Sequence, residues 1–224
     1  MSAFSIVVLI SGNGSNLQAI IDQISCGYLD AHIECVISNR PAAYGLERAA
    51  KHGISHYALD HTLFETREAY DAELIKLIQP HQPNCIILAG FMRILTADFF
   101  HQFKHKIINI HPSLLPKYQG LHTHQRALKN SDIEHGISVH IATEKLDSGP
   151  VIAQATFKLN NSDTIESLQK QCHQLEHILY PLVLRWLITK QLNISSGAVF
   201  FNQLAQPHPI KLNQVPLDDL PKTH

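Results

Sequence analysis

Apolar runs alternate with amphipathic segments from the beginning of the chain. Continuous runs of aliphatic and β-branched residues at residues 5–11, 84–89 and 106–111 predict strands that are buried on both faces, as in parallel sheets. Apolar residues recur at helical spacing between these runs, for example over residues 17–24. This alternation predicts an α/β fold, with an open, mostly parallel Rossmann-like sheet and helices on both faces.

The other elements follow from the same periodicities. Further strands are predicted at residues 32–38, 55–59, 136–142 and 151–159, and further helices at residues 42–51, 66–79, 96–103 and 122–129. Asp163 and Glu166 have the spacing of a capping box that opens a last helix, which Pro181 should kink or divide in two.

The C-terminal region predicts a small appendage. Residues 198–201 and 209–212 predict a hairpin, and residues 213–224 a loose tail. Because the chain has no internal repeat, low-complexity tract or linker, residues 1–224 are expected to form a single domain, with the hairpin and tail starting near residue 195.

Composition and charge exclude several classes of protein. The 224 residues include 18 Lys and Arg and 19 Asp and Glu, so the net charge of −1 gives no electrostatic reason to expect a nucleic-acid or membrane partner. The four cysteines are far apart in apolar surroundings, which predicts buried free thiols in a reducing compartment. The apolar run at the N-terminus lacks the basic region of a signal peptide, so we expect a cytoplasmic protein. Whether it is a monomer or a homodimer stays open.

The strand at residues 106–111 carries two polar side chains at its carboxyl end. Asn109 and His111 are two residues apart, so they point to the same face of the strand, and Pro112 ends the strand directly after them. A hydrogen-bonded structural pair would also explain them. Because ligands of open α/β sheets bind beyond the carboxyl ends of the strands, we favour a functional role.

A glycine-rich turn follows the first strand and precedes a helix. This order places backbone N–H groups and a positive helix end where an anion could bind, and it predicts a phosphate cradle formed by Gly14, Ser15 and Asn16. A plain tight turn is the alternative. A dinucleotide site is disfavoured, because Leu17 stands where the third glycine of its fingerprint should be and no acidic residue follows the second strand.

Neither a metal nor a covalent nucleophile is indicated by the sequence. The sixteen histidines are scattered, and the H-x-H pair at His122 and His124 has no carboxylate or thiol near it in the sequence. There is also no G-x-S-x-G elbow and no reactive-cysteine context. A metal-free site with Asn109, His111 and a nearby acid suits acyl transfer to an amine, because both side chains can donate hydrogen bonds to the oxygen that becomes negative. A carboxylate near His111 should keep its imidazole protonated.

Five segments together resemble the phosphoribosylglycinamide (glycinamide ribonucleotide) formyltransferases of purine synthesis. They are residues 9–17 (LISGNGSNL), 88–95 (LAGFMRIL), 109–116 (NIHPSLLP), 135–140 (HGISVH) and 146–150 (LDSGP). The resemblance runs from about residue 5 to residue 201. It implies direct transfer of a formyl group from 10-formyltetrahydrofolate to the amine of 5-phosphoribosylglycinamide in de novo purine (IMP) synthesis, with small-molecule substrates only and no metal.

The resemblance also implies roles for individual residues. Asn109 and His111 match the catalytic pair of the family, and Asp147 matches the acid that supports His111 and carries a proton. The ribonucleotide is implied to contact Gly14, Ser15, Asn16 and Glu176. The folate is implied to contact Arg67, Met92, Arg93, Ile94, Leu95 and Asn109. These folate roles would account for a cation in the first turn of a helix, at Arg67, and for the apolar residues Met92 and Leu95, which we expect to be exposed after a strand.

Proteins with the rival functions either have the same catalytic residues or are not catalysts. A formyltransferase acting on initiator methionyl-tRNA should have a basic surface and an extra binding domain, which the length and charge of this chain do not provide. A 10-formyltetrahydrofolate hydrolase would have no use for the phosphate cradle. A non-catalytic nucleotide- or folate-binding module would not need Asn109, His111 and Asp147 together.

Overall fold

The computed structural model describes residues 4–195 and 198–221 of the chain. By its internal contacts the chain divides into two compact units, residues 1–109 and residues 110–224, and each is described by itself. The single domain expected from the sequence stays a prediction.

The first unit is built on a parallel sheet. Its strands are β1 (Phe4–Ile10), β2 (Ala31–Ser38), β3 (His56–Ala58), β4 (Cys85–Leu88) and the first three residues of β5 (Ile107–His111). They lie in the order β3-β2-β1-β4-β5, and every neighbouring pair is parallel. The order reverses direction at β1, because β2 and β3 follow on one side of it and β4 and β5 on the other. Such a switch point is where open α/β sheets bind ligands.

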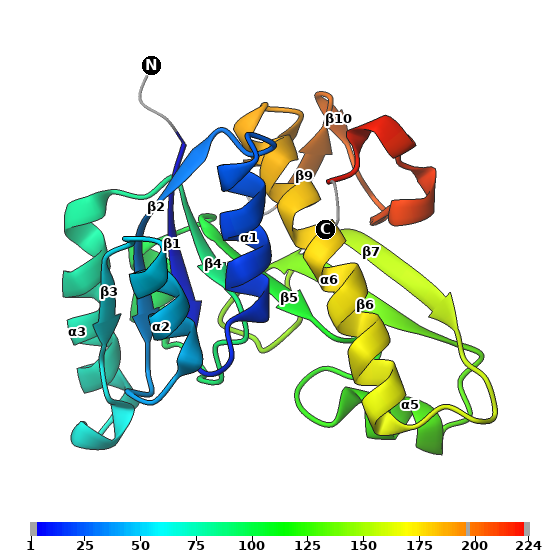
Figure 1. Cartoon of the computed structure of the whole chain (residues 1–224), viewed down its shortest axis with the longest axis horizontal. Coiled ribbons are helices and arrows are strands. Elements are labelled where there is room, and N and C mark those ends of the chain that lie inside the picture. The colour runs from blue at the N-terminus through cyan, green and yellow to red at the C-terminus, as the bar shows by residue number, and fades with distance from the viewer. Residues whose placement is uncertain (1–3, 196–197, 222–224) are drawn as a thin grey trace. The chain divides into compact units, whose positions relative to one another are not determined.

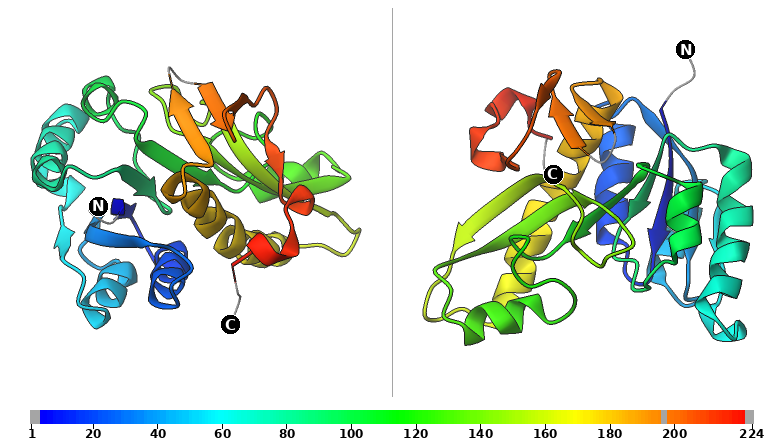
Figure 2. Two further views of the ribbon diagram at one scale, coloured as in Figure 1. Left: turned by 90° about the horizontal axis from the view of Figure 1, so that it is seen from above. Right: turned by 180° about the vertical axis from the view of Figure 1, so that it is seen from behind.

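Helices cover both faces of this sheet (Figure 1). They are α1 (Ser15–Ser25), α2 (Tyr44–Lys51), α3 (Arg67–Ile78) and α4 (Ala97–Gln102), with 3-10 turns at His61–Leu63 and Gln79–His81. The helices α1 and α2 lie on one face and α3 and α4 on the other, as the views from above and behind show (Figure 2). The predicted α/β architecture with helices on both faces is confirmed.

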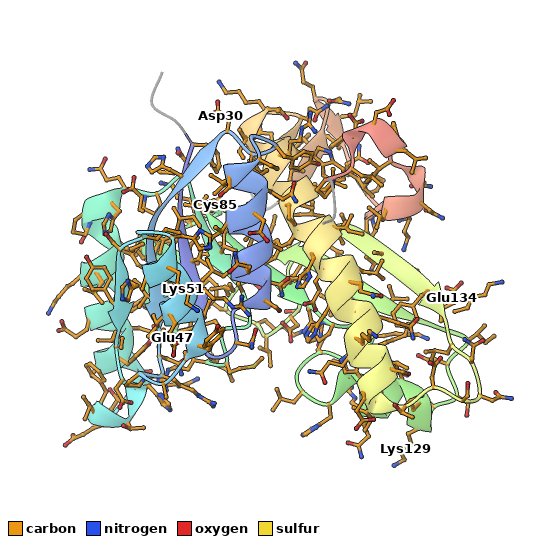
Figure 3. All side chains as sticks on the ribbon, viewed as in Figure 1. Asp30, Glu47, Lys51, Cys85, Lys129 and Glu134 are labelled. Carbon is orange, nitrogen blue, oxygen red and sulfur yellow. The ribbon has the colours of Figure 1, made fainter. Side chains whose placement is uncertain are left out.

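The helix α2 illustrates how the polar pattern orients an element. Leu46 and Ala49 are buried, whereas Glu47 and Lys51 are exposed and lie on the outer side of the helix (Figure 3). This division of one helix into a buried and a solvated face is typical of a helix that covers a sheet.

The second unit contains antiparallel pairs and one long helix. Its elements are α5 (Thr123–Lys129), β6 (Glu134–Ile141), β7 (Val151–Lys158), α6 (Ile165–Ile188), β8 (Leu192–Ser195), β9 (Ala198–Phe201), β10 (Leu204–Ala205) and β11 (Ile210–Lys211). β6 pairs antiparallel with β7, and α6 packs against both of them. Figure 2 shows α6 running along these two strands.

The predicted C-terminal hairpin is wrong in its pairing. β9 pairs antiparallel with β8 and β10, whereas β11 pairs parallel with β7. Short strands carry little pairing information in their sequence, so tertiary contacts decide their partners. Part of the predicted loose tail is ordered, as 3-10 turns at Leu212–Gln214 and Leu217–Asp219, and residues 222–224 lie outside the described residues.

Two details of α6 differ from the prediction. The N-cap is Thr164, whose hydroxyl oxygen accepts from the backbone N–H of Ser167, while the Ser167 hydroxyl oxygen accepts from the backbone N–H of Thr164. The capping box is therefore formed by these two residues and not by Asp163 and Glu166. Pro181 lies inside one continuous helix, so the helix is not divided in two, and the kink stays a prediction. The adjacent residue Thr164 competes successfully for the cap because threonine is itself a good capping residue.

Candidate active site

The turn after β1 is shaped by two glycines that touch. Gly14 has φ +73°, and a Cβ on it would lie 2.7 Å from the Cα of Gly45 at the start of α2. The turn therefore requires glycine at residue 14. It also requires a glycine at residue 45, where a Cβ would clash with Ile10 Cδ1, and the sequence did not predict this second requirement. Arg48 fixes the turn by donating to the backbone oxygen of Asn13 (2.9 Å) and to its side-chain oxygen (3.0 Å).

Ser15 and Asn16 form the first turn of α1. Gly14 precedes the helix as a left-handed N-cap, and no acidic side chain lies in the first turn. The N–H groups of a first helical turn have no partner within the helix and carry the positive end of its dipole. The three residues predicted to hold a phosphate are therefore together at a helix end that can bind one.

Ser11 ties this turn to two other loops that follow strands. Its hydroxyl accepts from the backbone N–H of Met92 (2.7 Å), after β4, and donates to the side-chain oxygen of Asn39, after β2. The predicted phosphate loop and the predicted folate turn are thus linked by one buried hydroxyl at the switch point between β1 and β4.

The predicted folate turn exposes apolar side chains, although not the expected pair. Met92 is 62% exposed and Ile94 is 48% exposed, but Leu95 is 5% exposed, so the expected exposure of Leu95 is wrong. Leu95 is buried because the turn ends there and the chain enters α4. Arg67, the first residue of α3, is exposed.

The helix α3 holds this turn through a buried acid. Asp71, 2% exposed, accepts from the backbone N–H of Thr96 through Oδ2 (2.6 Å). Arg93 stacks over the ring of Tyr70, with 4.4 Å between the guanidinium carbon and the ring centre. Burial raises the pKa of Asp71 above its ordinary range, although the Thr96 bonds and the Arg93 charge oppose that shift. Sequence reasoning gave Asp71 no role here.

In the second unit, His111 and Asp147 lie together. His111 Nδ1 is 3.4 Å from Asp147 Oδ2, and both side chains are buried. On its other side His111 Nε2 is 2.8 Å from the backbone oxygen of Tyr118, which can only accept, so Nε2 carries a proton. The carboxylate next to His111 is thus that of Asp147, a residue 36 positions further along the chain.

Asp147 has two further polar neighbours. Its Oδ2 accepts from the Gly120 N–H (2.9 Å), and its Oδ1 lies 3.6 Å from His140 Nε2. Its backbone has φ +46°, so the loop presents this carboxylate from a left-handed conformation that few residues adopt.

The two ionisable groups of this pair are shifted by different causes. Burial is the largest influence on His111 and lowers its pKa, outweighing the Tyr118 carbonyl and the Asp147 charge, which raise it. Burial would raise the pKa of Asp147, but the polar contact with His140, the charge of His111 and the Gly120 N–H together hold that pKa below its ordinary range. At neutral pH the resting pair is therefore a neutral imidazole beside a carboxylate. The expectation that the carboxylate keeps His111 protonated is wrong for the resting state, because desolvation dominates.

Sequence reasoning missed the role of His140. The side chains of Ser138 and His140 are two residues apart on β6 and both are buried, the same pattern of polar groups on one face of a strand that singled out Asn109 and His111. That pattern could have identified His140 before the structure.

The remaining predicted residues have defined surroundings. Asn109 is half-buried on β5, beside Leu88 of β4, and it faces the same side of the strand as His111. Glu176 is 5% exposed on the buried face of α6. A buried carboxylate on this face is unusual for packing alone.

Comparison with known proteins identifies the family. Residues 4–184 match the family model described as formyl transferase. The chain belongs to the formyl transferase family. The chain is 47% identical to the phosphoribosylglycinamide formyltransferase of Escherichia coli K12 over 88% of its length and 93% of that protein, and 41% identical to the one of Haemophilus influenzae over 90% and 95%.

Solved structures of formyl transferases agree in fold. The phosphoribosylglycinamide formyltransferase of Coxiella burnetii, solved with CHES, superposes with a TM-score of 0.88 at 46% identity over 93% of this chain and 100% of that one. Glycinamide ribonucleotide transformylase 1 of Symbiobacterium toebii superposes with a TM-score of 0.85 at 37% identity, over 89% of this chain and 94% of that one. The α/β fold and a transferase function are thus shared with this family. None of the helices in the described part of the chain has the length and apolar character needed to span a membrane.

Proposed function

We propose that this chain transfers the formyl group of 10-formyltetrahydrofolate to the amine of 5-phosphoribosylglycinamide, yielding formylglycinamide ribonucleotide and tetrahydrofolate in de novo purine synthesis. The observation that carries the proposal is the buried pair of His111 and Asp147, on a chain of the formyl transferase family. The pair offers a proton donor and a proton acceptor without a metal or a covalent nucleophile.

The chemistry follows from the charges that develop. The amine nitrogen attacks the formyl carbon, and the carbonyl electron pair moves to oxygen, which becomes negative. Asn109 donates its amide N–H to that oxygen and His111 donates a ring N–H; one such donor contributes about 10²–10³ in rate. The amine then loses a proton to the Asp147 carboxylate, the bond between the formyl carbon and N10 breaks, and N10 takes up a proton.

The resting state of His111 fits this sequence. Its Nε2 proton, donated to Tyr118 at rest, is available to the oxyanion once substrate replaces that acceptor. The amine proton that Asp147 takes up can pass to the facing Nδ1 of His111. The imidazolium formed in this way donates from Nε2 to the oxyanion, while the Asp147 carboxylate stabilises its charge.

Substrate binding is assigned to the groups that surround the two ligands. The ribonucleotide phosphate binds at the N-terminus of α1, to Gly14, Ser15 and Asn16, and Glu176 contacts its ribose or glycinamide part. The folate is assigned to Arg67, Asn109 and the turn Met92, Arg93, Ile94 and Leu95, of which Met92 and Ile94 offer exposed apolar surface.

The deciding experiment is a spectrophotometric assay of purified protein with 10-formyltetrahydrofolate, with and without the ribonucleotide, in chelator. Tetrahydrofolate formed only in the presence of the ribonucleotide is the expected result. Deformylation that ignores the ribonucleotide would replace the proposal by a hydrolase, and no reaction in either case would favour a binding module.

The phosphate assignment has its own test. Ser15→Ala should raise the KM for the ribonucleotide severalfold and leave the KM for folate unchanged. Ser25→Ala, at the other end of α1, is the matched control and should change neither. If Ser15→Ala impairs a dephosphorylated substrate analogue equally, its effect does not come from phosphate binding.

A further inference from the structure

Three potential ligand side chains meet in the second unit, and none has a role in the proposed transfer. They are His124 on α5, His135 on β6 and Cys172 on α6, and one ligand atom of each lies within 4.8 Å of the other two. The sequence offered His124 no thiol nearby, because Cys172 is 48 residues further along the chain. Folding supplies the missing neighbours.

The geometry of the two imidazoles suits a shared cation. His124 Nδ1 and His135 Nε2 are 2.9 Å apart, and the ring planes are nearly perpendicular at 85°. Zinc bonds of about 2.0–2.1 Å to nitrogen and 2.3 Å to sulfur, in a tetrahedron, separate the ligand atoms by roughly 3.3–3.7 Å. A cation would therefore require the imidazole pair to open by only a few tenths of an ångström.

Burial gives the cluster one accessible side. His135 and Cys172 are each 1% exposed, whereas His124 is half-buried on the short helix α5. A cation can approach past His124 and would then be enclosed by the other two side chains.

We propose that His124, His135 and Cys172 form a binding site for a borderline-soft divalent cation, Zn²⁺, with three protein ligands and a fourth position taken by water. Two imidazoles and a thiolate bind zinc in preference to the hard cations Mg²⁺ and Ca²⁺, which favour oxygen ligands. As the bond between sulfur and zinc forms, the Cys172 thiol loses its proton to solvent. The imidazole that donates the bond between His124 Nδ1 and His135 Nε2 moves its proton to its other nitrogen, so both rings bind through nitrogen lone pairs.

The surrounding charges agree with this chemistry. Burial holds both imidazoles in the neutral form that binds metal, lowering the pKa of His135 to about 4 and that of His124 below its ordinary value. Burial, with the charge of Glu176 one turn along α6, raises the pKa of Cys172, so binding has to displace a proton and should weaken as the pH falls.

Bound zinc would add metal bonds between three elements that weaker polar contacts already join. It would cross-link α5, β6 and α6, and because it binds the folded chain it should raise the unfolding temperature. This role is independent of the transfer reaction, so its test contains no substrate.

The test uses the full chain, reduced and stripped with chelator, and titrates it with Co²⁺ and then Zn²⁺. We expect one Co²⁺ per chain with a thiolate-to-cobalt charge-transfer band, which Zn²⁺ abolishes by displacement. Cys172→Ser should lose the band and raise the Kd for Zn²⁺ at least tenfold. The control Cys26→Ser removes the exposed thiol and should retain both.

Three results would overturn the site. The first is that the unmodified chain shows no charge-transfer band, and the second is a band that survives Cys172→Ser. The third is a band that is lost in Cys26→Ser, because that loss would indicate binding at the surface thiol. If Cys172→Ser does not fold by circular dichroism, His124→Gln on the accessible side serves in its place. It should keep the thiolate band but raise the Kd at least tenfold, and an unchanged Kd would refute the proposal.

Discussion

At the scale of single residues, His111 is placed between two acceptors but can donate to only one while it is neutral. Nε2 faces the Tyr118 carbonyl and Nδ1 faces Asp147, so a second proton would satisfy both, and burial opposes that proton. Burial outweighs both acceptors, so the pKa of His111 lies below its ordinary value and the ring is neutral at rest. The carboxylate at Nδ1 is nonetheless placed to stabilise a second proton that the ring gains and loses within one turnover.

Asp147 should act on the rate through its charge. Asp147→Asn keeps the shape and can still accept from the Gly120 N–H, but it cannot take a proton from the amine. We expect kcat to fall by about 10²-fold or more, with the KM of each substrate changed no more than a few-fold. Steady-state kinetics measures both, and Ser148→Ala, an exposed neighbour on the same loop, is the control that should retain the original kcat. A change confined to KM would contradict the role.

Asn109 should act on the same step through its amide. Asn109→Ala removes the proposed oxyanion donor from the end of β5, and we expect kcat to fall about 10²–10³-fold while folate affinity falls only modestly. Ile108→Val, on the opposite face of the same strand, controls for disturbance of β5 and should keep kcat within about twofold. Equal losses of folate binding and of kcat would mean that Asn109 positions the folate rather than stabilising the transition state.

At the scale of elements, the turn before α1 depends on close backbone contact. Gly14→Ala would place a Cβ 2.7 Å from the Cα of Gly45 and force alanine into a left-handed conformation, so we expect a stability loss of about 1–2 kcal/mol. The KM for the ribonucleotide should rise, because the first turn of α1 shifts. Gly12→Ala in the same turn has open space around its Cβ, and it is the matched control for urea denaturation and kinetics. Equal effects of the two substitutions would refute the contact argument.

The buried acid that holds the turn at residues 92–95 should make stability depend on pH. The folded-state pKa of Asp71 is raised, so ionising Asp71 costs the folded state free energy; that cost is absent well below pH 3.8 and grows as the pH rises through the raised value. Asp71→Asn keeps an oxygen for the Thr96 N–H and removes the charge.

We therefore expect the stability of Asp71→Asn, relative to the original chain, to increase between pH 4 and pH 7. Midpoints of urea denaturation at pH 4 and pH 7 measure this increase. The control is Asp98→Asn, which replaces an exposed acid on α4 and should show no such increase. A relative stability that instead decreases with pH would mean that the attraction between Asp71 and Arg93 outweighs burial.

Elements with long periodic patterns were predictable, and short ones were not. Helix α6 has apolar residues at helical spacing over many turns, and strand β1 is a continuous β-branched run that Gly12 follows closely. The pairs of β9 and β11 could not be predicted, since strands of two to four residues depend on the surfaces they meet. The cap of α6 was misplaced by one residue because Asp163 and Thr164 are both good capping residues.

At the scale of the whole molecule, the sequence identified chemical groups that lie at strand ends, but not groups that meet across the fold. Asn109 and His111 are neighbours on one strand, so alternation alone predicted them. The partnership of Asp147 with His140, and that of Cys172 with two histidines, depends on chain segments that only folding brings together. The exposed cysteine Cys26 also departs from the expectation of four buried thiols, because it follows the last turn of α1.

The overall charge of the chain separates its proposed substrate from the tRNA substrate of a rival formyltransferase. With 18 basic and 19 acidic residues, the net charge of −1 provides no excess of cations to replace the counterions of a polyanion. We expect labelled initiator tRNA to show no saturable binding by fluorescence anisotropy at low salt, and methionyl-tRNA to yield no formylated product under conditions that formylate the ribonucleotide. A basic tRNA-binding protein measured in parallel verifies that the probe can report binding. Saturable binding whose logarithmic binding constant falls linearly with the logarithm of the salt concentration would contradict this expectation. It would reveal a local basic surface that the net charge conceals.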